Sequence, residues 1–237
     1  MWSGNYSSWA ELENECGGYD SASILSQVAE RTRQANSIPN VYERDGCFIH
    51  GEPTYAFELL RWIKNSASGN EINVVDFGGS LGTTYHQLKP YLSGYKVRWN
   101  IIEQSNFVEA GKEFEDGSLY FYETIEECLS HHEICKAPSP TVFISSSALA
   151  YIETAWNILE KVANLNFEWV LLDRMSMIEG NSDRLTKQVV PPEIYDASYP
   201  CWFFGEEKLI NSMRDHGYKH LLTFQALGDD KGYVFQL

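Results

Sequence analysis

The sequence predicts a doubly wound α/β fold with a mostly parallel, seven-stranded sheet and helices on both of its faces. From Glu71 onwards, short apolar runs alternate with stretches of helical pattern, as they do in βαβ units. Near the C-terminus, two apolar runs are separated by residues 228–232, a length that suits an antiparallel hairpin. The 237 residues are enough for one such domain with an appended segment.

The expected elements follow from where the chain is apolar and where its apolar residues recur at helical spacing. Strands are expected at residues 72–77, 97–102, 119–122, 142–145, 169–172, 221–226 and 233–237. Helices are expected at residues 83–92, 107–114, 125–132, 155–163 and 206–215. Gly217 lies just beyond the last helical stretch, where a left-handed backbone favours glycine.

Residues 1–68 are expected to form an aromatic-rich, N-terminal helical extension of the core. Ser8 and Glu11 have the spacing of a capping box, which predicts the start of a helix. A second helix is expected over residues 22–34. Pro53 can open a third helix, because its missing N–H is not needed in a first turn. The remaining 69–237 would form the core.

Charge and composition exclude several classes of function. The formal net charge is −15 at pH 7, so most of the surface would repel a nucleic acid. No apolar run approaches the ~20 residues that span a bilayer, so no integral membrane segment is expected. Five irregularly spaced cysteines and the absence of a basic-then-apolar leader favour a reduced, cytoplasmic protein. A homo-oligomer is compatible with all of these features.

The most informative segment joins the first core strand to a helix. Residues 74–82 read Val-Val-Asp-Phe-Gly-Gly-Ser-Leu-Gly. The turn residues, which allow close approach of the backbone to a ligand, are Gly78, Gly79, Ser80 and Gly82. A dinucleotide fingerprint would need glycine at two further positions, which hold serine and threonine here, so NAD and FAD are disfavoured. Glycines that merely shape a tight turn are the alternative interpretation.

Two acidic residues flank this loop at the ends of neighbouring expected strands. Asp76 ends the first strand, at the position where S-adenosylmethionine (SAM) methyltransferases carry an acidic residue that helps to bind the aminoacyl part of the cofactor. Glu103 follows the second strand, about 25 residues beyond the loop, where a carboxylate can accept both ribose hydroxyls. SAM has both hydroxyls free. The combination predicts SAM as the cofactor and S-adenosylhomocysteine (SAH) as its product.

The fourth expected strand ends in a small polar stretch that includes Ser145 and Ser146. In class I methyltransferases this strand end passes under the methionine part of the cofactor, so both serines are expected to lie at the cofactor site. Together with seven strands that end in an antiparallel pair, it predicts a Rossmann-like class I methyltransferase core. A serine-rich strand end with Leu149 and Tyr151 in the core is the alternative.

Short segments over most of the chain carry a family resemblance: residues 6–9, 18–20, 42–45, 76–82, 145–151, 172–174, 194–195 and 198–200. In these segments the chain resembles a family of SAM-dependent methyltransferases found in bacterial lipopolysaccharide and O-antigen gene clusters. The resemblance implies a small-molecule or glycan acceptor, such as a sugar, a sugar nucleotide or a lipid-linked glycan. We therefore expect O-methylation of a carbohydrate or glycan precursor.

The acceptor is expected to bind under the insertion at residues 174–204, since insertions after the fifth strand commonly cover the acceptor pocket of this fold. Cationic and aromatic side chains there and in the extension are the expected acceptor-binding residues: Tyr42, Arg44, Arg174, Tyr195 and Tyr199. Methyl transfer depends mainly on alignment of acceptor and methyl group, and a base assists when the acceptor is a hydroxyl. The expected catalytic residues are His86 and Asp173.

Two other interpretations arise from the sequence. A non-catalytic protein with the same fold could serve as a partner or scaffold in glycan assembly, although the set of loop glycines, Asp76 and Glu103 favours a cofactor-binding enzyme. Four residues of one expected helix and its end invite a zinc site: Cys128, His131, His132 and Cys135. The two cysteines would be about 10 Å apart along a straight helix, so the helix alone cannot close a zinc site and no metal is expected.

Overall fold

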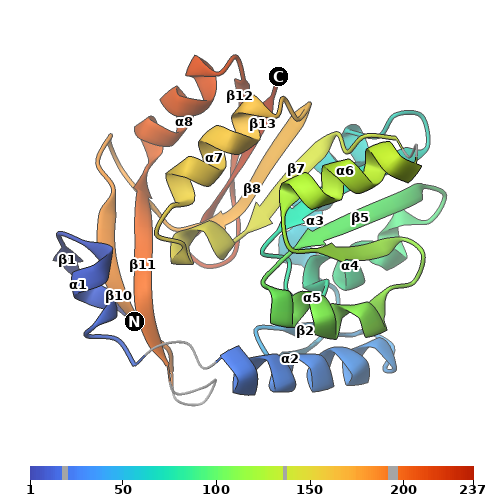
Figure 1. The fold of residues 1–237 in the computed structure, drawn as a ribbon, viewed down its shortest axis with the longest axis horizontal. Helices are drawn as coiled ribbons and strands as arrows, with labels where there is room; N and C mark the ends of the chain where they lie inside the picture. Colours follow the sequence, from blue (N-terminus) through green and yellow to red (C-terminus); the bar gives the residue numbers. More distant parts are fainter. Residues whose placement is uncertain (18–20, 136–137, 192–196) are drawn as a thin grey trace.

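The computed structural model describes residues 1–17, 21–135, 138–191 and 197–237, and a seven-stranded sheet forms its centre (Figure 1). The strands are β4 (Glu71–Phe77), β5 (Lys96–Ile102), β6 (Leu119–Tyr122), β7 (Val142–Ser146), β8 (Trp169–Met175), β12 (Lys219–Gln225) and β13 (Lys231–Gln236). Each of the seven overlaps one of the expected strands. The prediction of a seven-stranded sheet is confirmed.

The sheet is mostly parallel, with strand order β12-β13-β8-β7-β4-β5-β6. The neighbours from β6 to β8 pair in parallel, and β13 pairs antiparallel with both β8 and β12. Parallel neighbours require crossover connections, which here contain the helices. The direction of strand addition reverses between β4 and β7, and such a switch point opens a crevice at the carboxyl ends of the strands.

Helices cover both faces of the sheet, as predicted. One face carries α3 (Phe57–Asn65), α4 (Thr83–Leu88) with the 3-10 turn η2 (Lys89–Leu92), and α5 (Ser105–Gly111) with η3 (Lys112–Phe114). The other carries α6 (Ile125–Cys135), α7 (Ala155–Asn164) and α8 (Glu206–Asp215). Successive residues of a strand point to opposite faces, so Val74 packs in the first layer and Val75 in the second.

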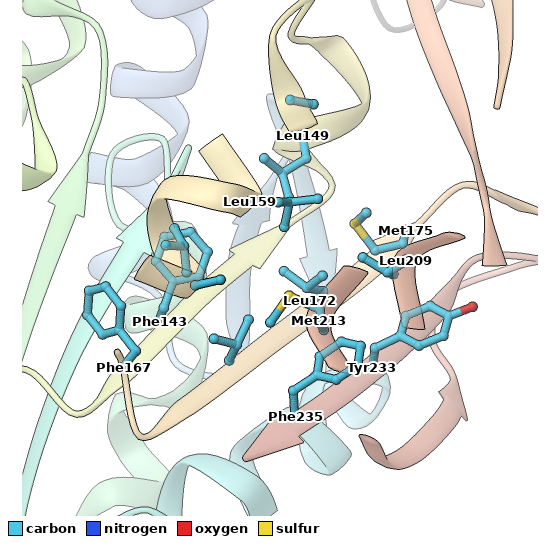
Figure 2. Close-up of a cluster of buried hydrophobic side chains, with 14 of the residues drawn as sticks. Phe143, Leu149, Leu159, Phe167, Leu172, Met175, Leu209, Met213, Tyr233 and Phe235 are labelled. Atoms are coloured by element: carbon cyan, nitrogen blue, oxygen red, sulfur yellow. The ribbon is translucent and has the colours of Figure 1, made fainter. Parts of the chain in front are cut away.

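Figure 2 shows the core between the sheet and the helices α7 and α8. Phe143, Leu172 and Phe235 project from β7, β8 and β13, and Leu159 and Met213 pack on them from the helices. All five side chains are at most 1% exposed. A core packed this closely holds the ends of β7 and β8 in fixed positions.

The N-terminal part differs from the helical extension that the sequence predicts. It consists of β1 (Trp2–Tyr6), α1 (Trp9–Glu13), α2 (Ser21–Asn36), β2 (Val41–Arg44), β3 (Cys47–His50) and η1 (Thr54–Ala56), followed by α3. The helices are present, and Ser8 caps α1 by accepting the backbone N–H of Glu11 at 3.3 Å. Three strands accompany them, so a purely helical extension is not confirmed.

Local turn chemistry explains one of these unexpected features. Asp45 and Gly46 connect β2 to β3 and have positive φ angles of 51° and 73°. Two consecutive left-handed residues are typical of a type I′ turn, for which Asp-Gly is a preferred pair. Ile24 and Val28 of α2 pack on the core, and α2 also lies against β2, so the hairpin is held beside the sheet.

The insertion forms part of a second sheet. It contains β9 (Met177–Ile178), β10 (Arg184–Val189) and β11 (Ser198–Gly205), and the sheet order is β1-β10-β11-β9. The sheet lies beside the central one, and β11 contacts the 3-10 turn η4 (Ala148–Tyr151) that follows β7 (Figure 1). None of the described helices combines the length and apolarity needed to cross a lipid bilayer.

Candidate active site

The glycine-rich loop connects the end of β4 to the start of α4, at the switch point of the sheet. Three of its residues have left-handed backbone φ angles: Gly78 (71°), Ser80 (54°) and Gly82 (87°). A Cβ on Gly78 would lie 2.2 Å from the Cβ of Ala148, and one on Gly79 would lie 2.8 Å from a carboxylate oxygen of Asp76. The glycines are therefore required for the loop to pack against η4 and the end of β4.

Asp76 is buried directly beneath this loop, with 1% exposure. Its Oδ2 accepts a hydrogen bond from Nε1 of Trp99 at 2.9 Å, whereas its Oδ1 is buried without a partner. Burial raises the pKa of Asp76 to about 7, against the opposing effect of the Trp99 hydrogen bond. A buried carboxylate oxygen without a donor is costly, and a cationic or hydrogen-bond-donating ligand group would satisfy it.

Glu103 closes the other side of the loop from the end of β5. Its Oε1 accepts the backbone N–H of Ser80 at 3.1 Å, and its Oε2 accepts the backbone N–H of Gln104 at 2.9 Å. Burial raises the pKa of Glu103, and the two backbone hydrogen bonds oppose that shift. The structure thus brings the predicted loop residues, Asp76 and Glu103 together at two adjacent strand ends.

Ser145 and Ser146 lie at the end of β7, beside the loop. Ser145 is fully buried and donates its hydroxyl to the carbonyl of Phe77 at 3.1 Å. Ser146 donates to Oδ2 of Asp173 at 2.6 Å, and so links the end of β7 to the end of β8. One serine therefore supports the loop, and the other faces the predicted acceptor side.

Asp173 and Arg174 form a polar pair at the end of β8. Asp173 is 1% exposed, and its Oδ1 is buried without a hydrogen-bond partner. Burial raises the pKa of Asp173, while the Ser146 hydroxyl and Arg174 lower it. Arg174 donates from Nε to Oγ of Ser146 at 2.9 Å and has a positive φ of 52°. Left-handed backbone at an arginine is strained, and such strain is concentrated at functional sites.

The hairpin of β2 and β3 adds a second arginine to this region. Asp45 Oδ2 lies 3.3 Å from Arg44 Nε and 3.7 Å from Arg174 Nη1, so one carboxylate oxygen pairs with both guanidinium groups. The Arg44 guanidinium stacks over the ring of Tyr55 at 4.5 Å, and the ring of Tyr42 lies 6.4 Å from that of Tyr55. Of the two predicted acceptor residues of the extension, Arg44 therefore lies next to Arg174 across Asp45, and Tyr42 lies beside Tyr55.

The second sheet contributes Tyr199 from β11. The Tyr199 ring meets the ring of Tyr151 edge-on at 5.2 Å, and burial raises the pKa of Tyr151. The predicted acceptor residue Tyr195 lies outside the described residues. The insertion thus reaches the turn that follows β7, on the side of Ser146 and Asp173.

His86 occupies a different environment from Asp173, the other expected base. It projects from α4 between the rings of Tyr85 and Phe114, and it lines a small cavity with Thr32 of α2. Burial lowers the pKa of His86 to about 4, and its Nε2 is buried without a partner. The structure brings Asp173, but not His86, into contact with the predicted serine and arginine.

Comparison with known proteins concerns the fold alone. No protein-family model and no curated protein matches the sequence. The structure is similar to the glycopeptide N-methyltransferase MtfA complexed with SAM, at 10% identity and a TM-score of 0.50 over 76% of this chain and 86% of that one. It is equally similar to a SAM-dependent methyltransferase from Clostridium acetobutylicum ATCC 824, at 11% identity and a TM-score of 0.50 over 77% and 90%.

A third similar structure is magnesium protoporphyrin IX methyltransferase (ChlM) from Synechocystis PCC 6803 with bound SAH. It is 11% identical, with a TM-score of 0.50 over 77% of this chain and 80% of that one. The chain has the class I methyltransferase fold. Its seven strands end in the antiparallel pair β12 and β13, which agrees with the layout predicted from the sequence.

Within the class I methyltransferase fold, sequence reasoning missed three residues of the site. Trp99 holds Asp76, Asp45 pairs with two arginines, and Asp230 accepts a hydrogen bond from Ser176 at 3.2 Å. The Asp-Gly pair between two β-prone stretches was a readable signal for the turn that carries Asp45. Trp99 and Asp230 had no such signal, because their partners are distant in sequence.

The two histidines of the suggested zinc site have other partners in this fold, and the side chain of Cys135 lies outside the described part of the chain. The Nδ1 of His131 lies 2.8 Å from the hydroxyl of Tyr122, and His132 lies within 3.3 Å of the Asn100 side chain and 2.8 Å of the Pro138 carbonyl. Burial raises the pKa of Cys128 to about 12. Among the described residues, no three His, Cys, Asp or Glu side chains are arranged to hold a metal ion.

Proposed function

We propose that the protein is a methyltransferase that uses SAM and releases SAH. The observation that carries this proposal is the loop at the switch point, with the partnerless Oδ1 of Asp76 beneath it and the Glu103 carboxylate beside it. Asp76 fits the cationic amino group of SAM, because an ammonium would both satisfy Oδ1 and favour the ionised carboxylate. The Glu103 carboxylate can accept hydrogen bonds from the two ribose hydroxyls of SAM. MtfA and ChlM were crystallised with SAM and SAH, respectively.

When bound, SAM supplies an electrophilic methyl group on a sulfonium. Asp173 would receive the proton that an acceptor hydroxyl loses as its oxygen becomes methylated. Its Oδ1 is free, its pKa is raised by burial, and Ser146 fixes Oδ2 at 2.6 Å. A carboxylate with a raised pKa is a better base near neutral pH, and such assistance contributes about 10²–10⁴ in rate.

We infer further that the acceptor is a hydroxyl-bearing carbohydrate or glycan precursor. The family resemblance to enzymes of lipopolysaccharide and O-antigen clusters supports this class. The cluster of Tyr42, Tyr55 and Arg44 supports it as well. Its aromatic rings can stack on the apolar face of a sugar, and its guanidinium can donate hydrogen bonds to sugar hydroxyls. Peptide, nucleic-acid and amine acceptors are the competing classes.

Calorimetry of SAH binding tests the cofactor assignment. The change Glu103→Ala should weaken SAH binding roughly ten- to a hundredfold, because a hydrogen bond to a charged group is worth ~1.5–3 kcal/mol. The matched control is Glu109→Ala, which removes a carboxylate whose side chain is 76% exposed and should leave the affinity unchanged. Equal SAH affinity in wild type and Glu103→Ala would contradict the assignment.

A transfer screen tests the acceptor class. The protein is incubated with SAM that carries a radiolabelled methyl group and with sugar nucleotides, lipid-linked glycans, peptides or RNA. We expect label in a carbohydrate fraction, as a methyl ether that resists mild base. We also expect Asp173→Asn to lower kcat while SAH affinity is retained, because Asp173 acts on the acceptor. Label confined to peptide or RNA would refute the carbohydrate assignment.

A further inference from the structure

Arg44 and Arg174 are cationic groups almost removed from solvent. Their side chains are 11% and 14% exposed, and they come from different elements, β2 and β8. Burial of a guanidinium is costly unless its charge is paired and its N–H groups find acceptors. The hydrogen-bond and ion-pair partners of these two guanidinium groups therefore indicate which kind of ligand the site can bind.

The charges are paired, but the hydrogen bonds are incomplete. Arg44 Nε lies 3.3 Å from Asp45 Oδ2, yet its N–H does not point at that oxygen and is buried without an acceptor. Arg174 uses Nε on Ser146, and its Nη1 lies 3.7 Å from Asp45, beyond hydrogen-bond distance. Asp45 Oδ2 thus faces both guanidinium groups without a hydrogen bond to either, and the other ion pair of Arg174 is with Asp173, at 4.0 Å from Nε to Oδ2.

Asp45 is an exchangeable partner for these arginines. It stands at the turn of the β2–β3 hairpin, and its side chain is 61% exposed. Asp45 is the exposed member of both pairs, so water can solvate its carboxylate when it leaves, whereas the two buried guanidinium groups then need another anionic partner. A ligand with two or more anionic oxygens could make the hydrogen bonds that Asp45 leaves unmade, and arginine favours such oxyanions.

Two other carboxylates face the same arginines, Asp173 and Asp230. Each is already held by a hydroxyl donor, Ser146 for Asp173 at 2.6 Å and Ser176 for Asp230 at 3.2 Å. Burial raises the pKa of both, which reduces the negative charge that they present. Of Asp45, Asp173 and Asp230, Asp45 is therefore the carboxylate that a ligand can displace from the arginines, because its side chain is largely exposed.

We propose that Arg44 and Arg174 form an oxyanion subsite for the acceptor, and that Asp45 occupies it until a phosphoryl or carboxylate group of the acceptor takes its place. The proposal rests on the methyltransferase function, because it assigns this subsite to the substrate of that reaction. The acceptor is accordingly a carbohydrate that also carries an oxyanion, and binding of this group would position a sugar hydroxyl near Asp173.

The test is titration calorimetry with two probes, sodium pyrophosphate and sodium D-glucuronate, each added to protein saturated with SAH. Asp45→Asn removes the internal competitor and should tighten binding of the matching probe about three- to tenfold. A preference for pyrophosphate would indicate a phosphoryl-linked sugar, and a preference for glucuronate a uronic acid. Asp215→Asn is the matched control for loss of one negative charge, since Asp215 is exposed at the end of α8.

Two arginine variants complete the experiment. Arg44→Gln in the Asp45→Asn background should weaken probe binding at least tenfold. Arg44→Lys should also weaken it, because lysine keeps the charge but lacks the planar fork. Circular dichroism and SAH affinity establish that each variant is folded. A gain in Asp45→Asn no larger than in Asp215→Asn, or binding unaffected by both Arg44 variants, would overturn the subsite.

The outcome separates this proposal from the proposed function. SAH binding should be the same in wild type and Asp45→Asn, since the Asp45 carboxylate pairs with Arg44 and Arg174 on the acceptor side. Protein that binds SAH but shows no Asp45-dependent probe binding would refute the subsite and leave the methyltransferase assignment standing. Protein that fails to bind SAH would refute the assignment itself, whichever probe binds.

Discussion

Asp76 illustrates how one buried residue can couple stability to pH. Its pKa is raised to about 7 because burial disfavours the charged form, whereas in the unfolded chain it titrates near 3.8. The folded protein thus binds the Asp76 proton more tightly than the unfolded one. The resulting stabilisation is fully present below the unfolded pKa and is lost as the pH rises through about 7.

At the residue scale, we predict that Asp76→Asn is more stable relative to wild type at pH 8 than at pH 5. The amide resembles the protonated acid and still accepts from Trp99, so it removes the loss on ionisation, on the order of 2 kcal/mol over this range. Urea unfolding at both pH values measures it. Asp215→Asn controls for the loss of one charge, and a difference that is independent of pH would contradict the raised pKa.

At the scale of elements, the glycine-rich loop combines two separate steric demands. Gly78 has a left-handed backbone, which favours glycine. It also lies so close to Ala148 that a Cβ added at Gly78 would be 2.2 Å from the Cβ of Ala148. Gly94 also has a left-handed backbone, with φ 91°, but nothing lies within 4 Å of a Cβ placed there. Comparing alanine substitutions at Gly78 and Gly94 therefore separates the cost of backbone strain from the cost of steric overlap with Ala148.

We predict that Gly94→Ala destabilises the protein by about 1–2 kcal/mol, the cost of a left-handed alanine. Gly78→Ala should cost about 1–3 kcal/mol more, because the loop or η4 must also shift to relieve the overlap. Urea midpoints give both values, and SAH affinity should fall in Gly78→Ala alone. Equal destabilisation by the two changes would show that η4 does not confine the loop.

At the scale of the whole molecule, the net charge of −15 is the dominant electrostatic feature. The twelve ion pairs found among described residues join groups of opposite sign and leave this excess of negative charge in place. Self-repulsion of a highly charged surface opposes the compact state, and salt screens it over about 10 Å at 0.1 M.

We predict that added salt stabilises the protein. Raising sodium chloride from about 0.02 M to about 0.3 M shortens the screening length well below the size of the molecule, so the urea midpoint should rise. Choline chloride at the same ionic strength should have the same effect, because screening does not depend on the identity of the cation. A rise with sodium alone would point to specific ion binding, and a fall in either salt would refute the argument.

The sequence by itself determined the core of this protein. Apolar runs and helical periodicity predicted all seven strands of the central sheet, and they also placed the glycine-rich loop, Asp76 and Glu103 at the ends of β4 and β5. These features were readable because they are local. Strand, turn and helix follow each other within a few residues, and the spacing of apolar residues along the sequence indicates which side chains are buried.

Only the tertiary structure decided what surrounds that core. β1 became a strand because it pairs with β10, more than 180 residues away in the case of Trp2 and Gln188, and no local pattern encodes such a partner. The acceptor side was decided in the same way. Arg44 and Arg174 meet at Asp45 because the hairpin folds back over the end of β8, whereas His86, equally plausible by residue type, is turned towards α2 and Phe114. The position of a side chain that depends on long-range contacts is decided by packing. The sequence determines that packing only through the whole fold, and not through a local pattern.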